Sequence, residues 1–213
     1  IIFKPDKLHW VIGPEQSLAL KQMFSVCEQL GIGKISDFVH IAYGYMSIKG
    51  KGKMSSRLGN VVYIDDLLDE AKQRMKKIMD EAQFAKLLAK DDKKEIAKVS
   101  EQLGIGAVKY SILKVGRMQD IGFDFDESLS FAGNSGPYLQ YTYSRAKSVL
   151  SKNRTTTWGA KLKSPLGCKK EELAILRTLY KFPEVVLSAA QNYAPNLICN
   201  YLYDLAQKFN TFY

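Results

Sequence analysis

Short apolar runs and one helical repeat alternate at the start of the chain. Residues 8–13 are a buried strand by their length and by the Gly-Pro pair that closes them. Residues 15–30 repeat apolar side chains at helical spacing and end at Gly31. Residues 37–48 are aromatic and β-branched, which favours a second strand region. A strand–helix–strand order predicts a parallel sheet, and because such sheets are covered on both faces, we interpret this segment as the tail of a larger α/β domain.

After residue 62 the apolar period becomes 3.6 residues and predicts helices. Asp65 and Asp66 begin the first one, where acidic groups suit the helix dipole. Its apolar stripe consists of Leu67, Leu68, Ala71, Met75, Ile78, Met79 and Ala82. The further predicted helices, with Gly104 as a stop between the first two, span residues 93–103, 105–116, 136–152, 170–181, 184–193 and 196–212. The expected fold is mainly α, with a helical bundle behind an α/β segment.

Composition and charge predict neither a membrane-spanning nor a secreted protein, and they favour a partner with many negative charges. The 213 residues carry a formal net charge of +9, and residues 128–170 contain lysines and arginines but no acidic residue, which favours a polyanionic partner. No apolar run approaches the ~18 residues of a membrane span, and residues 1–10 have no secretory pattern. Three cysteines without metal-ligand spacing are interpreted as free thiols in a reducing compartment, so we expect a cytoplasmic protein without membrane association.

Residues 49–60 form the first segment with candidate chemistry. They contain four cations, three glycines and no acidic residue, directly after a predicted strand. Glycines let a backbone approach a ligand closely, and the cations can neutralise phosphates. The spacing is not that of a Walker loop, and a solvated basic hairpin is the competing interpretation.

Residues 131–145 form the second segment with candidate chemistry. Gly-Asn-Ser-Gly-Pro is a turn, and Pro137 is placed to open a helix. Helical spacing predicts a core-facing stripe of Leu139, Tyr143, Ala146 and Leu150. A second stripe, roughly 130° away, contains Tyr138, Tyr141, Arg145 and Lys152. Tyrosines interleaved with cations suit unstacked bases and their phosphates, although packing of both tyrosines against a neighbouring helix explains them equally well.

Both segments resemble motifs of one enzyme family. Residues 53–57, Lys-Met-Ser-Ser-Arg, resemble the Lys-Met-Ser-Lys-Ser loop of class I aminoacyl-tRNA synthetases. Residues 131–145 resemble the Glu-Gly-Asn-Thr-Gly-Pro-Tyr-Leu-Gln-Tyr motif of arginyl-tRNA synthetases. Further matches to that family, in the same order along the chain, are at residues 10–16, 61–71, 106–110 and 205–213. The resemblance covers nearly the whole chain.

The resemblance implies a fold and a reaction. Residues 1–62 are then the C-terminal part of a Rossmann-like catalytic domain, residues 63–118 a helical connecting region, and residues 119–213 a helical anticodon-binding domain that is incomplete at its C-terminus. The implied reaction is ATP-dependent attachment of arginine to its tRNA through an arginyl-adenylate, by a protein that is monomeric at full length. The implied partners are tRNA, arginine and ATP, with Mg²⁺ as the counter-ion of ATP and no metal site of the protein.

The resemblance also assigns site residues. The expected catalytic residues of the ATP-phosphate loop are Lys53, Ser55, Ser56 and Arg57, where Arg57 stands beside the position of the family's second lysine. The expected ATP contacts are Tyr45, Met46 and Lys53, and the expected arginine contact is Gln16. The expected tRNA contacts are Asn134, Tyr138, Tyr141 and Arg145.

One family motif is missing. Class I synthetases carry His-x-Gly-His early in the catalytic domain, and the only histidines here are His9 and His40, which we interpret as packed strand residues. We therefore expect a fragment that is inactive alone. The alternatives are a non-catalytic tRNA-binding module, or a cysteine or methionine synthetase of the same class. The acidic cluster at residues 124–127 is interpreted as helix caps and salt-bridge partners.

Overall fold

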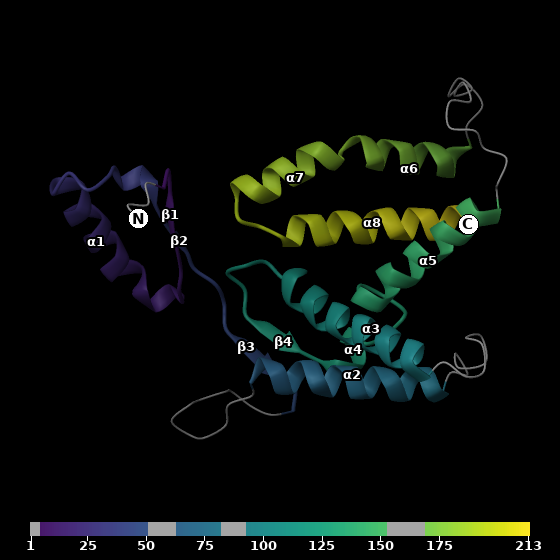
Figure 1. The fold of residues 1–213 in the computed structure, drawn as a ribbon. Helices are drawn as coiled ribbons and strands as arrows, with labels where there is room; N and C mark the ends of the chain where they lie inside the picture. The colour runs from purple at the N-terminus through teal and green to yellow at the C-terminus, as the bar shows by residue number, and fades with distance from the viewer. Residues whose placement is uncertain (1–4, 51–62, 82–92, 153–168) are drawn as a thin grey trace.

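The computed structural model describes residues 5–50, 63–81, 93–152 and 169–213. A small α/β unit comes first and a helical body follows, as the pattern predicts (Figure 1). In chain order the elements are β1 (Leu8–Val11), the 3-10 turn η1 (Pro14–Gln16), α1 (Ser17–Gln29), the 3-10 turn η2 (Ile35–Asp37), β2 (Phe38–Ile41), β3 (Met46–Ile48), α2 (Ile64–Glu81), α3 (Lys93–Leu113), β4 (Ile121–Phe123), α4 (Phe125–Ser128), α5 (Gly136–Lys152), α6 (Lys170–Tyr180), α7 (Phe182–Gln191) and α8 (Asn196–Phe212).

The N-terminal unit consists of a parallel strand pair and its crossover helix. β1 pairs with β2 in parallel, with Leu8 opposite Phe38, and α1 connects the two strands. The rings of Phe24 and Phe38 stack with centroids 5.4 Å apart and bury Leu20 beside them. Gly31 has a φ of +71°, the left-handed conformation that commonly ends a helix. The predicted parallel unit and its helix stop are confirmed. The prediction that the first strand is buried is wrong, because Leu8 and Val11 of β1 are 41% and 63% exposed.

The second predicted strand region, residues 37–48, contains two strands that belong to different sheets. β2 pairs with β1, whereas β3 pairs in parallel with β4, with Met46 opposite Ile121. Gly44 lies between them, and its N–H donates to the carbonyl of Arg117 at 2.8 Å. A side chain at Gly44 would collide with the backbone of Gln119. The chain changes sheets because a glycine permits this close backbone approach.

The central core is formed where α2 and α3 pack against the β3–β4 sheet. Leu67, Ala71, Met75 and Met79 of α2 are fully buried there, which confirms the predicted stripe; Leu68 and Ile78 are partly buried beside them, and Ala82 lies outside the described residues. The partners of α2 in this core include Ile48, Ala107, Val108, Phe123, Phe125 and Leu129. The core therefore joins segments from both sides of residue 62.

α3 runs through Gly104 without a break, so the prediction of two helices there is wrong. An added Cβ at Gly104 would lie 3.0 Å from the backbone of Ala71, which means that α2 crosses α3 at this point. An added Cβ at Gly136 would lie 2.8 Å from the carbonyl oxygen of Gly106, at the crossing of α5 and α3. These glycines serve helix–helix contact and not helix termination.

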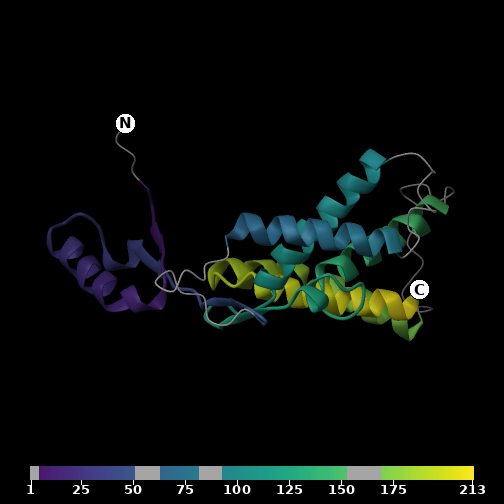
Figure 2. The same ribbon diagram turned by 90° about the horizontal axis from the view of Figure 1, so that it is seen from below.

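α5 to α8 form the C-terminal bundle, with α6 and α7 on the outer side of α8 (Figures 1 and 2). The predicted core face of α5 is wrong in part, because only Leu139 and Ala146 of its four residues are partly buried. Tyr143 and Leu150 are 61% and 74% exposed, whereas Pro137 and Thr142 are buried. The N-terminal half of α5 packs against α3 and α8, and Thr142 there accepts a hydrogen bond from Asn210 of α8 at 2.8 Å. The C-terminal turns of α5 extend past the neighbouring helices.

Asp124 is a helix cap, as predicted. Its carboxylate accepts hydrogen bonds from the N–H groups of Asp126 at 2.8 Å and Glu127 at 3.4 Å, at the start of α4. The ammonium of Lys49 lies 2.6 Å away and holds the pKa of Asp124 below its ordinary value, together with these N–H groups. Glu127 in turn pairs with Lys114 at 2.6 Å. Within the described residues no helix has the length and apolar character needed to cross a membrane.

We expect Gly136→Ala to lower the free energy of unfolding by roughly 1–3 kcal/mol, because the added methyl group meets backbone atoms that cannot rotate away. The midpoint of urea denaturation measures this loss. Gly122→Ala is the matched control, because an added Cβ there has no atom within 4 Å. Equal midpoints for the two variants would contradict the proposed close crossing of α3 and α5.

Asp124→Asn should lower the melting temperature at neutral pH, because the amide loses the ion pair with Lys49. The folded-state pKa of Asp124 is depressed, so its contribution is present above the ordinary value of 3.8 and disappears as the pH falls through the folded-state value. The difference between wild type and variant should therefore shrink in thermal melts below about pH 3.8. A difference that is constant from pH 7 to pH 3 would rule out this linkage.

Candidate functional site

The loop expected to bind ATP phosphates lies outside the described residues, together with its four expected catalytic side chains, Lys53, Ser55, Ser56 and Arg57. The strand that leads into the loop is described. The N–H of Lys49, directly after β3, donates to the carbonyl of Phe123 at 2.9 Å, and Gly50 follows with a φ of +85°. The loop thus begins at the carboxyl end of a parallel strand, the edge at which α/β proteins bind ligands.

Tyr45 and Met46 connect the two sheets. The N–H of Tyr45 donates to the carboxylate of Asp120 at 2.8 Å, and its carbonyl accepts from the N–H of Ile121 at 2.7 Å. Met46 begins β3 and packs on the central core. The phenol of Tyr45 donates to the carboxylate of Glu15 at 3.1 Å, which raises the pKa of Tyr45. Because the backbone of Tyr45 is engaged within the protein, its exposed ring is the group available to a ligand.

Gln16 lies near Tyr45 at the carboxyl edge of the first sheet. It ends η1 with an exposed side chain, next to Glu15, whose carboxylate contacts Tyr45. Two segments far apart in sequence therefore present polar groups at one edge. His40 is half-buried with Nε2 3.0 Å from the carbonyl oxygen of Ile12, in agreement with its interpretation as a packed strand residue. The same interpretation of His9 is wrong, because its side chain is exposed on β1.

The predicted aromatic and basic stripe on α5 faces the end of α8. The guanidinium of Arg145 lies 4.5 Å from the ring centroid of Tyr141 and 5.0 Å from that of Tyr213. Tyr141 is 39% exposed and Tyr213 is 57% exposed. Cation–π contacts of this kind hold an arginine flat against aromatic rings. Two accessible rings and a cation are thus gathered at one end of the bundle.

Tyr138 has a different environment from Tyr141. It is half-buried, its ring lies edge-on to Tyr203 with centroids 5.7 Å apart, and its hydroxyl accepts a hydrogen bond from Asn210 at 3.0 Å. Asn210 also accepts from Arg145 at 3.1 Å. Tyr138 therefore packs within the bundle, as the competing interpretation held, while Tyr141 presents its ring to solvent.

Asn134 is not brought together with these residues. Its side-chain oxygen accepts from the hydroxyl of Tyr110 at 2.6 Å, and its carbonyl accepts from the ammonium of Lys114 at 2.9 Å. Tyr110 also donates to the carbonyl of Cys199 at 3.1 Å, and burial raises its pKa. These contacts belong to the junction of α3 with α8, at the opposite end of that helix from Tyr213.

Sequence reasoning missed Asn210 and Tyr213 as members of the site. Both lie in residues 205–213, a stretch noted for its resemblance but given no role. Asn210 is more than sixty residues from its partners on α5, so no local spacing connects them. A polar residue inside the apolar pattern of α8 was the only available signal.

The remaining sequence candidates are structural. Among the described residues no group of three or more His, Cys, Asp or Glu side chains is arranged to hold a metal ion. Cys27 and Cys199 are free cysteines, as predicted, and Cys168 lies outside the described residues.

Comparisons with known proteins identify the family. A model described as the catalytic domain of class I tRNA synthetases (R) matches residues 2–125, and a model of the DALR anticodon binding domain matches residues 139–213. The arginine–tRNA ligase of Flavobacterium psychrophilum is 36% identical over 207 residues, which cover 96% of this chain and 33% of the relative. The arginine–tRNA ligase of Clostridium acetobutylicum is 38% identical over 208 residues, which cover 98% of this chain and 35% of the relative.

Solved structures agree with this fold. The arginyl-tRNA synthetase of Thermus thermophilus superposes with a TM-score of 0.81 at 28% identity, covering 98% of this chain and 33% of that one. The arginyl-tRNA synthetase of Plasmodium falciparum superposes with a TM-score of 0.72 at 23% identity, covering 98% of this chain and 34% of that one. At this identity the similarity shows the fold alone. The chain spans about a third of the length of the curated relatives it matches. It belongs to the class I arginyl-tRNA synthetase family.

Proposed function

We propose that the chain is the part of an arginine–tRNA ligase that carries the ATP-phosphate loop and the anticodon-binding surface. Family membership supports the reaction, and the exposed Tyr141–Arg145–Tyr213 cluster supports the RNA contact. The cluster is the observation that carries the proposal, because it lies within the stretch that matches an anticodon-binding domain.

In the proposed reaction the carboxylate of arginine attacks the α-phosphorus of ATP, pyrophosphate leaves, and the arginyl group then passes from the adenylate to tRNA. Negative charge builds up on the leaving pyrophosphate. The cations and hydroxyls of the loop accelerate this step if they bind that charge more strongly in the transition state than in ATP itself. We assign this role to Lys53, Ser55, Ser56 and Arg57, with Arg57 supplying the charge of the family's second lysine and Mg²⁺ entering as the counter-ion of ATP.

We further propose that Gln16 contacts arginine and that the exposed ring of Tyr45, beside Met46, contacts ATP. Both lie at the carboxyl edge of the parallel strands, and the Glu15–Tyr45 hydrogen bond at 3.1 Å keeps the two segments together.

On the bundle, Tyr141 and Tyr213 provide faces on which unpaired anticodon bases stack, and Arg145 between them provides a charge for the adjoining phosphate. Tyr138 supports this surface from inside through Asn210. Asn134 supports the start of α5 through Tyr110 and is assigned a positioning role for the anticodon surface.

A second candidate is a tRNA-binding module without catalysis, since the printed chain contains no His-x-Gly-His. The gene sequence upstream of Ile1 separates the two candidates. A His-x-Gly-His motif there decides for the ligase.

Tyr141→Ala should weaken binding of a tRNA transcript by roughly 5- to 150-fold, the equivalent of about 1–3 kcal/mol for one stacked base. The free energy of unfolding should change by less than about 1 kcal/mol, because the side chain is partly exposed and loses one cation–π contact. Fluorescence anisotropy at a stated salt concentration measures the affinity. Tyr180→Ala is the control, since it removes a tyrosine that is 87% exposed on α6; equal tRNA affinity of the Tyr141 variant and wild type would reject the stacking role.

The 213-residue chain alone, given ATP, arginine and tRNA, should exchange no pyrophosphate into ATP, because the His-x-Gly-His motif of the family is not in its sequence. A full-length family member assayed in parallel serves as the positive control. Exchange above the background of a protein-free sample would contradict this expectation.

A further inference from the structure

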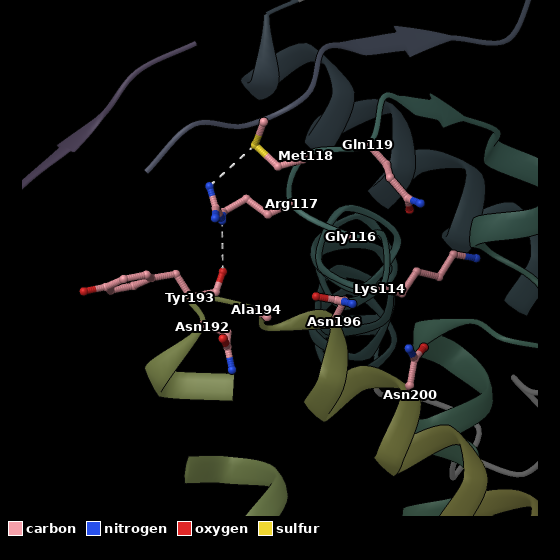
Figure 3. A pocket seen from close by; sticks show the side chains of 10 residues that line it. All are labelled: Lys114, Gly116, Arg117, Met118, Gln119, Asn192, Tyr193, Ala194, Asn196 and Asn200. Carbon is pink, nitrogen blue, oxygen red and sulfur yellow. Dashed lines mark hydrogen bonds between the residues drawn. The ribbon is translucent and has the colours of Figure 1, made fainter. Parts of the chain in front are cut away.

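A cavity of about 410 Å³ lies where the end of α3 meets the turn between α7 and α8 (Figure 3). Its lining includes Lys114 and Arg117 from one side and Asn196 and Asn200 from the first turns of α8. Figure 3 shows the two asparagine side chains extending from α8 on the side that faces residues 114–119. None of the expected site residues lines this cavity.

The lining of the cavity contains two cationic side chains but no acidic one. The ammonium of Lys114 donates to Glu127 at 2.6 Å and to the carbonyl of Asn134 at 2.9 Å, which leaves one of its three N–H groups. Arg117 donates through Nε to the carbonyl of Tyr193 and through Nη1 to that of Ala42, and its Nη2 has no partner among the described residues. Both cations are therefore held in place by the protein, and each keeps an N–H group that has no partner among the described residues.

Four neutral amides also line the cavity, and one of them, Asn192, donates to the carbonyl of Ser188. Within the described part of the chain the side chains of Gln119, Asn196 and Asn200 form no hydrogen bond to protein. Asn196 and Asn200 are one helical turn apart and so lie on the same face of α8, whose amino end adds partial positive charge. Amides both donate and accept, which suits phosphate oxygens and ribose hydroxyls alike.

We propose that this cavity binds a phosphate and the adjoining ribose of an RNA backbone, as a second and sequence-independent contact to the tRNA. The inference rests on the proposed function. The one aromatic side chain of the lining, Tyr193, extends away from the other lining side chains (Figure 3), and its ring packs edge-on with that of His9, with centroids 5.3 Å apart. The cavity therefore offers no free ring for stacking a base, and it recognises charge and hydroxyl groups.

The position of the cavity fits such a contact. α8 begins at the cavity with Asn196 and ends beside Tyr213, and a helix of its 17 residues is roughly 25 Å long. One RNA molecule that touches both ends of α8 must span that length. Contacts to phosphates along such a molecule fix its orientation but carry no sequence information.

The test uses the double variant Asn196→Asp/Asn200→Asp. It places two negative charges in the cavity without changing side-chain size, at residues that hold no other part of the described chain. Gln191→Glu is the control, because it adds a negative charge at an exposed position on the neighbouring α7 that does not line the cavity. Thermal melts first establish that both variants are folded like wild type.

Affinity for a tRNA transcript is then measured over a range of salt concentrations. The double variant should bind about tenfold more weakly at low salt, and the slope of log K against log[salt] should fall by about one. The loss should be the same for transcripts with the arginine anticodon and with an altered one, whereas Tyr141→Ala should affect the former more. The Gln191 variant should stay close to wild type.

Other outcomes overturn the inference. If the double variant keeps the wild-type affinity and slope while Tyr141→Ala weakens binding, the cavity assignment is wrong and the proposed function stands. If wild type binds neither transcript, both are wrong. Loss of inorganic phosphate binding in the double variant without a change in tRNA affinity would identify a site for free anions in place of RNA.

Discussion

The side chain of Arg117 holds the α/β unit against the helical body, and the relation between the two parts depends on it. Its guanidinium donates to the carbonyl of Ala42, between β2 and β3, and to that of Tyr193, between α7 and α8. The guanidinium is planar and permanently charged, so its donors leave in fixed directions. Tyr193 has a φ of +50°, which a residue with a side chain rarely adopts, and its hydroxyl contacts His9 of β1. One arginine thus orients three segments that are far apart in sequence.

This junction gives the proposed function its geometry. A ligase that joins arginine to tRNA must hold ATP and arginine at one end and the anticodon at the other. In the proposed function, the carboxyl edge of the β1–β2 sheet and the aromatic cluster at the end of α8 are those two ends. The body between them is stiffened by backbone contacts, with Gly104 against α2 and Gly136 against α3. Because close-packed helices shift little relative to each other, the two ends keep their separation.

The aromatic cluster illustrates how one polar residue organises a binding surface. Asn210 donates to Tyr138 and Thr142 and accepts from Arg145, so a single side chain connects α8 to three positions of α5. This network fixes Arg145 between the rings of Tyr141 and Tyr213. In the proposed RNA contact, the rings and the cation are therefore arranged in advance, so that little side-chain entropy remains to be lost on binding.

Periodicity and punctuation in the sequence determined the order of elements in the α/β unit, the buried stripe of α2, the approximate ranges of α5 to α8, and the cap at Asp124. Each of these depends mainly on neighbours within a few residues. The family resemblance rests likewise on contiguous motifs. Only the tertiary structure decided that Gly104 lies within a helix, that residues 37–48 divide between two sheets, and that Thr142, not Tyr143, faces the core. It also decided that Tyr138 supports the surface while Tyr141 is presented on it. These outcomes depend on Ala71, Gln119 and Asn210, which are distant in the chain, and local spacing carries no information about which distant backbone a residue will meet.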